Sequence, residues 1–108
     1  METTVEHEVQ RIIVNVSGDV DLASADQLKE TLDEVLTGSP QHVIIDMTPV
    51  TFMDSTGLGV LVRALKRARE AGTRLDLVIS HERVLKVLAI TQLDTVLSIH
   101  PSIDAVPV

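Results

Sequence analysis

The stretch FMDSTGLG combines an acid with two hydroxyl groups and two glycines. Asp54, Ser55 and Thr56 are residues that favour the start of a helix. Gly57 and Gly59 oppose this tendency, because each glycine in a helix interior costs about 0.8–1 kcal/mol relative to alanine. The combination therefore indicates a corner of the chain that needs small, polar groups open to close approach.

A serine in this setting could act as a nucleophile, but the other parts of known serine and phosphate sites are missing. The sequence has no Gly-Lys-Ser/Thr ending of a Walker A loop, and no third glycine completes a dinucleotide-binding loop after Gly57 and Gly59. The Gly-x-Ser-x-Gly turn of hydrolases is half present, because Met53 occupies the position of its first glycine. The histidines have no spacing that suggests a catalytic triad. We therefore expect a protein that is not an enzyme.

Carboxylates are the other groups that could carry chemistry. Oxygen ligands suit Mg²⁺, and four aspartates could gather into a magnesium site: Asp19, Asp21, Asp46 and Asp54. Aspartate is also a common residue of turns and helix caps, and we favour this second interpretation. The four histidines are scattered without the spacing of metal ligands, which favours surface or packing roles. We predict neither a metal site nor a cofactor.

The composition indicates one soluble domain that spans residues 1–108. The single aromatic residue, Phe52, implies an aliphatic core and excludes a site built on base stacking. A net charge of −7 argues against nucleic acid and against an anionic membrane as partners. The sequence shows no cysteine, no signal peptide and no long apolar run, so we expect a cytoplasmic location.

Strand-like and helix-like segments alternate along the chain, which is typical of an α/β fold. Apolar patterns predict strands within residues 11–18, 42–46, 73–80 and 95–100, with a weaker edge strand at 3–9. Strands joined by helices should be parallel, with right-handed crossovers. We therefore predict a single domain with a mixed, mostly parallel sheet of four or five strands and helices packed against it.

Three helices are expected between these strands. The first opens with a capping-box pattern, in which Ser24 and Gln27 would satisfy amides reciprocally. The second should run from about Ser55 to Ala71 and end at Gly72. The third should follow the strand that ends near residue 80.

The carboxyl ends of parallel strands meet at one edge of a sheet, where open α/β folds usually place their binding sites. Four chemistry-bearing residues follow the predicted strands at that edge: Asp21, Asp46, Asp54 and Ser55. We therefore expect these side chains to lie near one another.

The second predicted helix also carries four basic residues, Arg63, Lys66, Arg67 and Arg69. They could form a basic docking face, or they could be the solvated side of an amphipathic helix. We favour the solvated side, because runs of charge on a helix are commonly exposed to water.

The segment VIIDMTPVTFMDSTGLGVLV resembles the signature of the STAS-domain anti-sigma factor antagonists of bacteria. The shared pattern is an apolar strand that ends in Asp, a loop with an apolar-Asp-Ser step, and a helix that opens with Gly-Leu-Gly. The segment SGDVDLASA is similar to a second recurrent segment of the family, and the order of strands and helices fits over nearly the whole chain. The chain departs from the family in lacking an Asp-Gly turn between the first two strands and a glycine in ITQLD.

The resemblance implies a phosphorylation switch at Ser55. In the family, the serine at this position is phosphorylated by a partner anti-sigma factor that is itself a serine kinase. The unphosphorylated form binds that partner and releases the sigma factor. The residues that the resemblance assigns to partner binding are Asp21, Asp54, Ser55, Thr56, Gly57 and Leu58. We expect the free chain to be a monomer or weak dimer that contacts neither nucleic acid nor a membrane.

A second interpretation is a constitutive interaction module or a ligand-sensing STAS module. In that case Ser55 would be only a helix cap, and its replacement by alanine would cost about 0.5–2 kcal/mol of stability.

Overall fold

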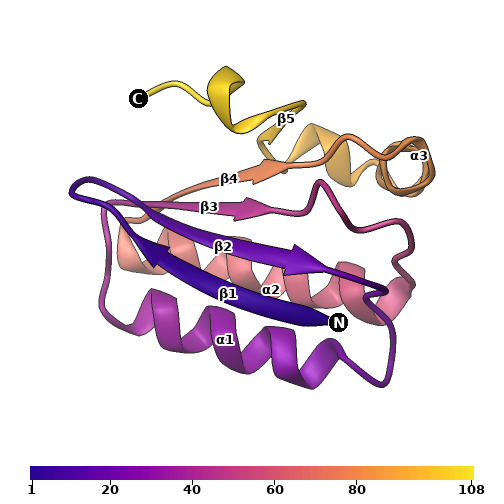
Figure 1. The fold of residues 1–108 in the computed structure, drawn as a ribbon, viewed down its shortest axis with the longest axis horizontal. Coiled ribbons are helices and arrows are strands. Elements are labelled where there is room, and N and C mark those ends of the chain that lie inside the picture. Colours follow the sequence, from indigo (N-terminus) through magenta and orange to yellow (C-terminus); the bar gives the residue numbers. More distant parts are fainter.

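The strand-forming segments assemble into one five-stranded sheet in the computed structural model, which describes all of residues 1–108 (Figure 1). The strands are β1 (Glu2–His7), β2 (Ile12–Ser17), β3 (His42–Asp46), β4 (Arg74–Val78) and β5 (Ile99–His100). They lie in the sheet in this order, with β1 antiparallel to β2 and all other neighbours parallel. The predicted mixed, mostly parallel sheet is confirmed.

Three helices and two short 3-10 turns complete the fold. They are α1 (Ala25–Thr37), α2 (Ser55–Ala71), α3 (Glu82–Ile90), η1 (Leu93–Thr95) and η2 (Ile103–Ala105). Helices α1 and α2 lie side by side on one face of the sheet, and α3 lies near the end of β4 (Figure 1). As predicted, α2 ends at Gly72, whose φ of 72° is the left-handed conformation that glycine adopts easily.

The weak edge strand predicted at residues 3–9 is present as β1, but it ends at His7. The chain then turns through Glu8–Arg11, where the amide of Glu8 donates to the carbonyl of Arg11 at 2.9 Å. This longer turn connects the first two strands without the Asp-Gly pair that short hairpins favour.

The last predicted strand, residues 95–100, is shorter than expected. Only Ile99 and His100 pair with β4, because the residues before them belong to the 3-10 turn η1 and the loop that follows it. The apolar pattern of this segment therefore reflects packing of a turn as well as of a strand.

Gln92 stands in ITQLD at the position where the family pattern has a glycine. It precedes η1 with a φ of 61°, in the left-handed region where glycine is least strained. From there the carbonyl of Leu93 accepts hydrogen bonds from the amides of Val96 and Leu97 at 3.1 and 2.9 Å. The turn thus forms with glutamine at the strained position.

The capping box predicted from Ser24 and Gln27 is wrong. The Ser24 backbone is already helical, and its side chain makes no hydrogen bond to the start of α1. Its hydroxyl instead accepts from the amide of Asp21 and donates to the carbonyl of Asp19, both at 3.0 Å. Ser24 therefore closes the loop between β2 and α1.

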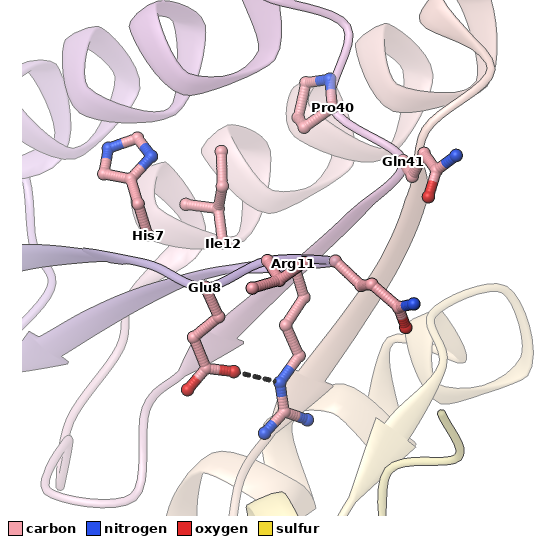
Figure 2. Close-up of a pocket in the computed structure, with 8 residues that line it drawn as sticks. His7, Glu8, Arg11, Ile12, Pro40 and Gln41 are labelled. Atoms are coloured by element: carbon pink, nitrogen blue, oxygen red, sulfur yellow. Dashed lines mark hydrogen bonds and ion pairs between the residues drawn. The ribbon is translucent and has the colours of Figure 1, made fainter.

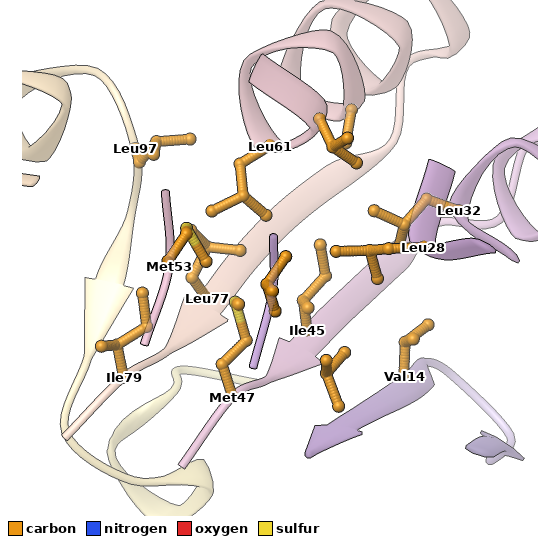
Figure 3. Packing of buried hydrophobic residues seen from close by; sticks show 14 of the residues in the cluster. Val14, Leu28, Leu32, Ile45, Met47, Met53, Leu61, Leu77, Ile79 and Leu97 are labelled. Carbon is orange, nitrogen blue, oxygen red and sulfur yellow. The ribbon is translucent and has the colours of Figure 1, made fainter. Parts of the chain in front are cut away.

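Alternation along the strands produces apolar layers on both faces of the sheet. The larger core lies between the sheet and the helices and includes Val14, Leu28, Leu32, Ile45, Leu61 and Leu77 (Figure 3). On the opposite face, the C-terminal segment covers a smaller cluster of Ile13, Ile44, Val78 and Val106. Burial on both faces explains why β3 reads as a continuous apolar run.

The first turn of α2 packs so closely on the sheet that Gly57 is required there. A Cβ at this position would lie 2.8 Å from side-chain carbons of both Met53 and Val20, closer than packed carbons approach. A Cβ at Gly59 would have no neighbour within 4 Å. Packing therefore explains one glycine of the Gly-Leu-Gly sequence and leaves the other without a structural reason.

Candidate functional site

Two loops meet at the end of the sheet where β2 and β3 finish. A short parallel bridge joins Val20 to Met53, with the amide of Val20 donating to the carbonyl of Phe52 at 3.0 Å. The amide of Asp54 then donates to the carbonyl of Val20 at 3.1 Å. These bonds bring residues 19–23 against the segment that leads into α2, although about thirty residues separate them in the sequence.

The carboxylate of Asp54 holds this corner together. Oδ1 accepts from the amides of Thr56 and Gly57 at 3.0 and 3.1 Å, which makes Asp54 the N-cap of α2. Oδ2 accepts from the amide of Leu22 at 3.2 Å, across the junction of the two loops. One side chain therefore fixes both the helix start and the neighbouring loop.

Ser55 is the first residue of α2, and its side chain takes no part in the cap. It is exposed to solvent, as is Ala23 in the facing loop. The interpretation of Ser55 as a helix cap is therefore wrong, because the Asp54 carboxylate accepts the hydrogen bonds of the Thr56 and Gly57 amides. The serine hydroxyl stands at the positive end of the helix dipole.

The expected gathering of acids is only partly correct. The carboxylate of Asp21 folds back on its own turn, accepting from the amide of Ala23 at 3.1 Å and from the Ser24 hydroxyl at 3.2 Å. Asp54 thus accepts from the amide of Leu22, and Asp21 accepts from the next amide along the loop. Asp46 does not join them, since it alternates with buried Ile45 and so points to the other face of the sheet.

Asp46 lines a separate hollow with Asn15, Ser17 and Pro49, and one of its oxygens accepts from the amide of Thr48. No group of three or more histidine or acidic side chains in the structure is arranged to hold a metal ion. The four aspartates considered as a magnesium site are not gathered in one place.

The remaining residues of the corner differ in exposure. Thr56 is half-buried, whereas Gly57 and Leu58 are buried beneath the helix start. Two apolar side chains that the sequence pattern did not single out are open to solvent: Leu22 is 76% exposed and Phe52 is 43% exposed. The sequence feature that could have indicated their exposure is a large apolar residue in a loop segment, Leu22 in DLAS and Phe52 in TFMD.

The STAS domain family matches residues 1–106. An anti-sigma-B factor antagonist of Listeria monocytogenes is 34% identical over 94 residues, which cover 87% of this chain and 82% of the relative. The chain belongs to the STAS-domain anti-sigma factor antagonist family.

Solved structures agree with this membership in the STAS family. An anti-sigma factor antagonist from Mycobacterium paratuberculosis superimposes with a TM-score of 0.89 at 27% identity, covering 95% of this chain and 87% of that one. SpoIIAA of Bacillus in its phosphorylated form has a TM-score of 0.73 at 17% identity and covers 96% of both chains. The second likeness shows the fold alone.

The basic residues of α2 in this STAS domain lie on the solvated side of the helix as predicted, with Arg63, Lys66 and Arg69 exposed and Arg67 half-buried. Arg63 and Arg67 form ion pairs with the two oxygens of Asp33 on α1, at 3.1 and 3.2 Å. The hydrogen bond from Arg63, with the charges of both arginines, holds the pKa of Asp33 below its usual value. Half of the basic run therefore joins α1 to α2, while Lys66 and Arg69 form no ion pair.

A polar cluster lies on the sheet face opposite α1 and α2, and the sequence did not reveal it. Asp76 of β4 has a side chain only 3% exposed, and its two oxygens contact His42 Nε2 at 2.7 Å and His100 Nε2 at 2.9 Å. Arg74 Nε lies 3.0 Å from the same carboxylate. Burial opposes ionisation of Asp76, but hydrogen bonds from Ser98, His100 and His42 and the charge of Arg74 outweigh it, so its pKa is lowered.

An open hollow lies at the other end of the sheet from Ser55, between the β1–β2 turn and the segment before β3 (Figure 2). The side chains around it include His7, Gln41 and an ion pair of Arg11 with Glu8. Because the two charges neutralise each other, the hollow offers little net charge to a ligand.

None of the helices in the structure is long and apolar enough to cross a membrane.

Replacing Asp54 by Ala should lower the free energy of unfolding by about 1 kcal/mol, because the N-cap of α2 is lost. Replacing Ser55 by Ala should change it by less than about 0.5 kcal/mol, since the Ser55 side chain makes no cap bond. Urea unfolding followed by circular dichroism measures both. An equal loss in the two variants would contradict the assignment of the cap to Asp54.

Stability should fall in acid as Asp76 becomes protonated. Because its pKa is lowered by folding, its contribution is present above the unfolded pKa of about 3.9 and is lost as pH falls through the lower folded value. The difference in unfolding free energy between wild type and Asp76→Asn should therefore narrow below about pH 4. Asp104→Asn, which changes an exposed aspartate, is the control. A difference that stays constant from about pH 6 to pH 3 would contradict this role.

Proposed function

We propose that this chain is a phosphorylation-switched anti-sigma factor antagonist. The unphosphorylated form binds an anti-sigma factor that is also a serine kinase, and this binding releases a sigma factor. Phosphorylation of Ser55 by the same partner ends the binding. The partner class comes from the names of the relatives, which are anti-sigma factor antagonists. The chain acts in the cytoplasm as a regulator and kinase substrate, not as an enzyme.

The exposure of Ser55 is the observation that carries this proposal. A kinase needs a hydroxyl that it can approach closely, and Ser55 is exposed at the first position of α2. Asp54 satisfies the helix amides in its place, so that phosphorylation requires no loss of the cap. The corner is also joined to the Val20 loop by backbone hydrogen bonds, which hold the target in place for the kinase.

The docking surface combines polar and apolar groups around this hydroxyl. Phe52 supplies an exposed aromatic side chain of the kind enriched in protein interfaces, and Leu22 adds an exposed apolar side chain. Asp21 and Asp54 hold the two loops in position, and Thr56 borders the serine. Two buried residues, Gly57 and Leu58, support the surface from beneath.

The phosphate would act at the interface and leave the fold intact. It adds about 1.5–2 negative charges, and a negative charge at a helix N-terminus is locally favourable by about 0.3–1 kcal/mol. Asp54 already places a carboxylate beside Ser55, so the added charge creates a strongly acidic spot. A partner surface that carries nucleotide phosphates or acidic side chains would be repelled from it.

Incubation of the chain with ATP and each anti-sigma kinase of its source organism should add one phosphate group, detected by intact-protein mass. Ser55→Ala should abolish the addition, and Thr56→Ala should preserve it, because the half-buried threonine is the less accessible hydroxyl.

The same kinase should bind wild type only transiently when ATP is present, and it should bind Ser55→Ala stably. A phosphate that persists in Ser55→Ala would place the modification elsewhere. The absence of any phosphate with active kinases would favour a constitutive binding module.

A further inference from the structure

An exposed stripe of α2 leads away from Ser55 along the helix. Its members are Ser55, Gly59, Val62, Lys66 and Arg69, all of them exposed. At 3.6 residues per turn, these positions lie within about 40° of Ser55 around the helix axis. The stripe is about 20 Å long at 1.5 Å per residue. A partner that docks at Ser55 can therefore follow the same helix face without changing direction.

Gly59 is the feature of this stripe that the fold does not explain. It is exposed inside a helix, and a Cβ there would meet nothing within 4 Å. Glycine in such a position weakens the helix relative to alanine, so the chain keeps a less stable residue where a more stable one fits. A bare backbone permits close approach by another chain, and Gly59 lies one turn beyond Ser55.

An open groove of about 320 Å³ lies next along the stripe. Its apolar walls are Val62 and Leu65 of α2 and Val96, which follows η1. Val62 is 42% exposed and Val96 is 47% exposed. Its polar rim consists of Lys66, Arg69 and Glu70.

The rim of the groove carries unpaired positive charge on a chain that is acidic as a whole. The chain as a whole has a net charge of −7, yet two cations on the groove rim, Lys66 and Arg69, form no ion pair with Glu70 or with any other acid. The other arginines of α2, Arg63 and Arg67, share the single negative charge of Asp33. The unpaired cations beside an apolar groove match a partner segment that carries an apolar side chain next to an acidic one.

We propose that this stripe and groove form a second contact for the anti-sigma kinase, continuous with the Ser55 corner. A segment of the kinase crosses Gly59 at close range, seats an apolar side chain between Val62 and Val96, and places an acidic side chain near Lys66 and Arg69. The inference rests on the proposed function. In this proposal the groove residues contribute to the choice of partner. The phosphate at Ser55 does not touch them, because Val62 lies about 10 Å further along the helix.

Three variants and one control test the contact with the anti-sigma kinase identified by the mass experiment. Affinity is measured by calorimetric titration with ADP and without ATP. Val62→Asp should weaken binding by about tenfold or more, because a charge would enter the apolar groove. The double variant Lys66→Glu with Arg69→Glu should weaken it by about tenfold in low salt, and by less in high salt, where the charges are screened. As a control, the double variant Arg83→Glu with Lys86→Glu on α3, which makes the same change of charge at two exposed positions, should leave affinity within about twofold.

Gly59→Ala separates docking from stability. It should raise the thermal midpoint by about 2–5 °C, since alanine favours the helix, while lowering affinity for the kinase several-fold. Normal binding of wild type, with affinity unchanged in Val62→Asp, in the double variant and in Gly59→Ala, would overturn this inference and leave the proposed function standing. Failure of wild type to bind any kinase would overturn both. Self-association of wild type that Val62→Asp abolishes, with kinase binding unchanged, would show that a second copy occupies the groove.

Discussion

The candidate functional corner depends on the hydrogen bonds of the Asp54 carboxylate. Its two oxygens accept hydrogen bonds from three backbone amides. Two of these amides belong to the first turn of α2, and the third is that of Leu22 in the loop after β2. The helix start and the loop thus form one unit, although they come from distant parts of the sequence. Gly57 is a consequence of this arrangement, because the helix start fixed by Asp54 leaves no space for a Cβ against Val20 and Met53. Ser55 is then left exposed, with no structural task of its own.

The two faces of the sheet serve different purposes. The helical face carries the large apolar core and presents the start of α2 at one end of the molecule. The opposite face is held by the C-terminal segment and by Asp76, which joins β3, β4 and β5 through two histidines. The start of α2 and the buried charge of Asp76 therefore lie on opposite faces of the sheet. Under the proposed switch, a phosphate on Ser55 would alter binding and leave the Asp76 cluster in place.

The alternation and breaker residues of the sequence were sufficient to predict the sheet, the helix from Ser55 to Ala71 and its end at Gly72, because these depend on local preferences. The failures occurred where a tertiary contact overrode a local pattern. Ser24 has the sequence of a capping box, but its hydroxyl serves the Asp21 loop. The Asp76 cluster was missed because its members come from three strands, and the spacing of His42 and His100 along the chain carries no sign of it. Only the presence of an aspartate within an apolar strand hinted at buried partners.

The most direct test of this account compares the chain phosphorylated on Ser55 with the unmodified chain, in kinase affinity and in amide NMR spectrum. We expect affinity to fall by about a hundredfold or more, as for a charge forced into an interface. Chemical shift changes should be confined to the Leu22 loop and to residues 52–59, with the signals of the sheet unchanged. Unchanged affinity would contradict the switch. A general loss of dispersed signals would show that phosphorylation acts by unfolding the domain, contrary to the role assigned to Asp54.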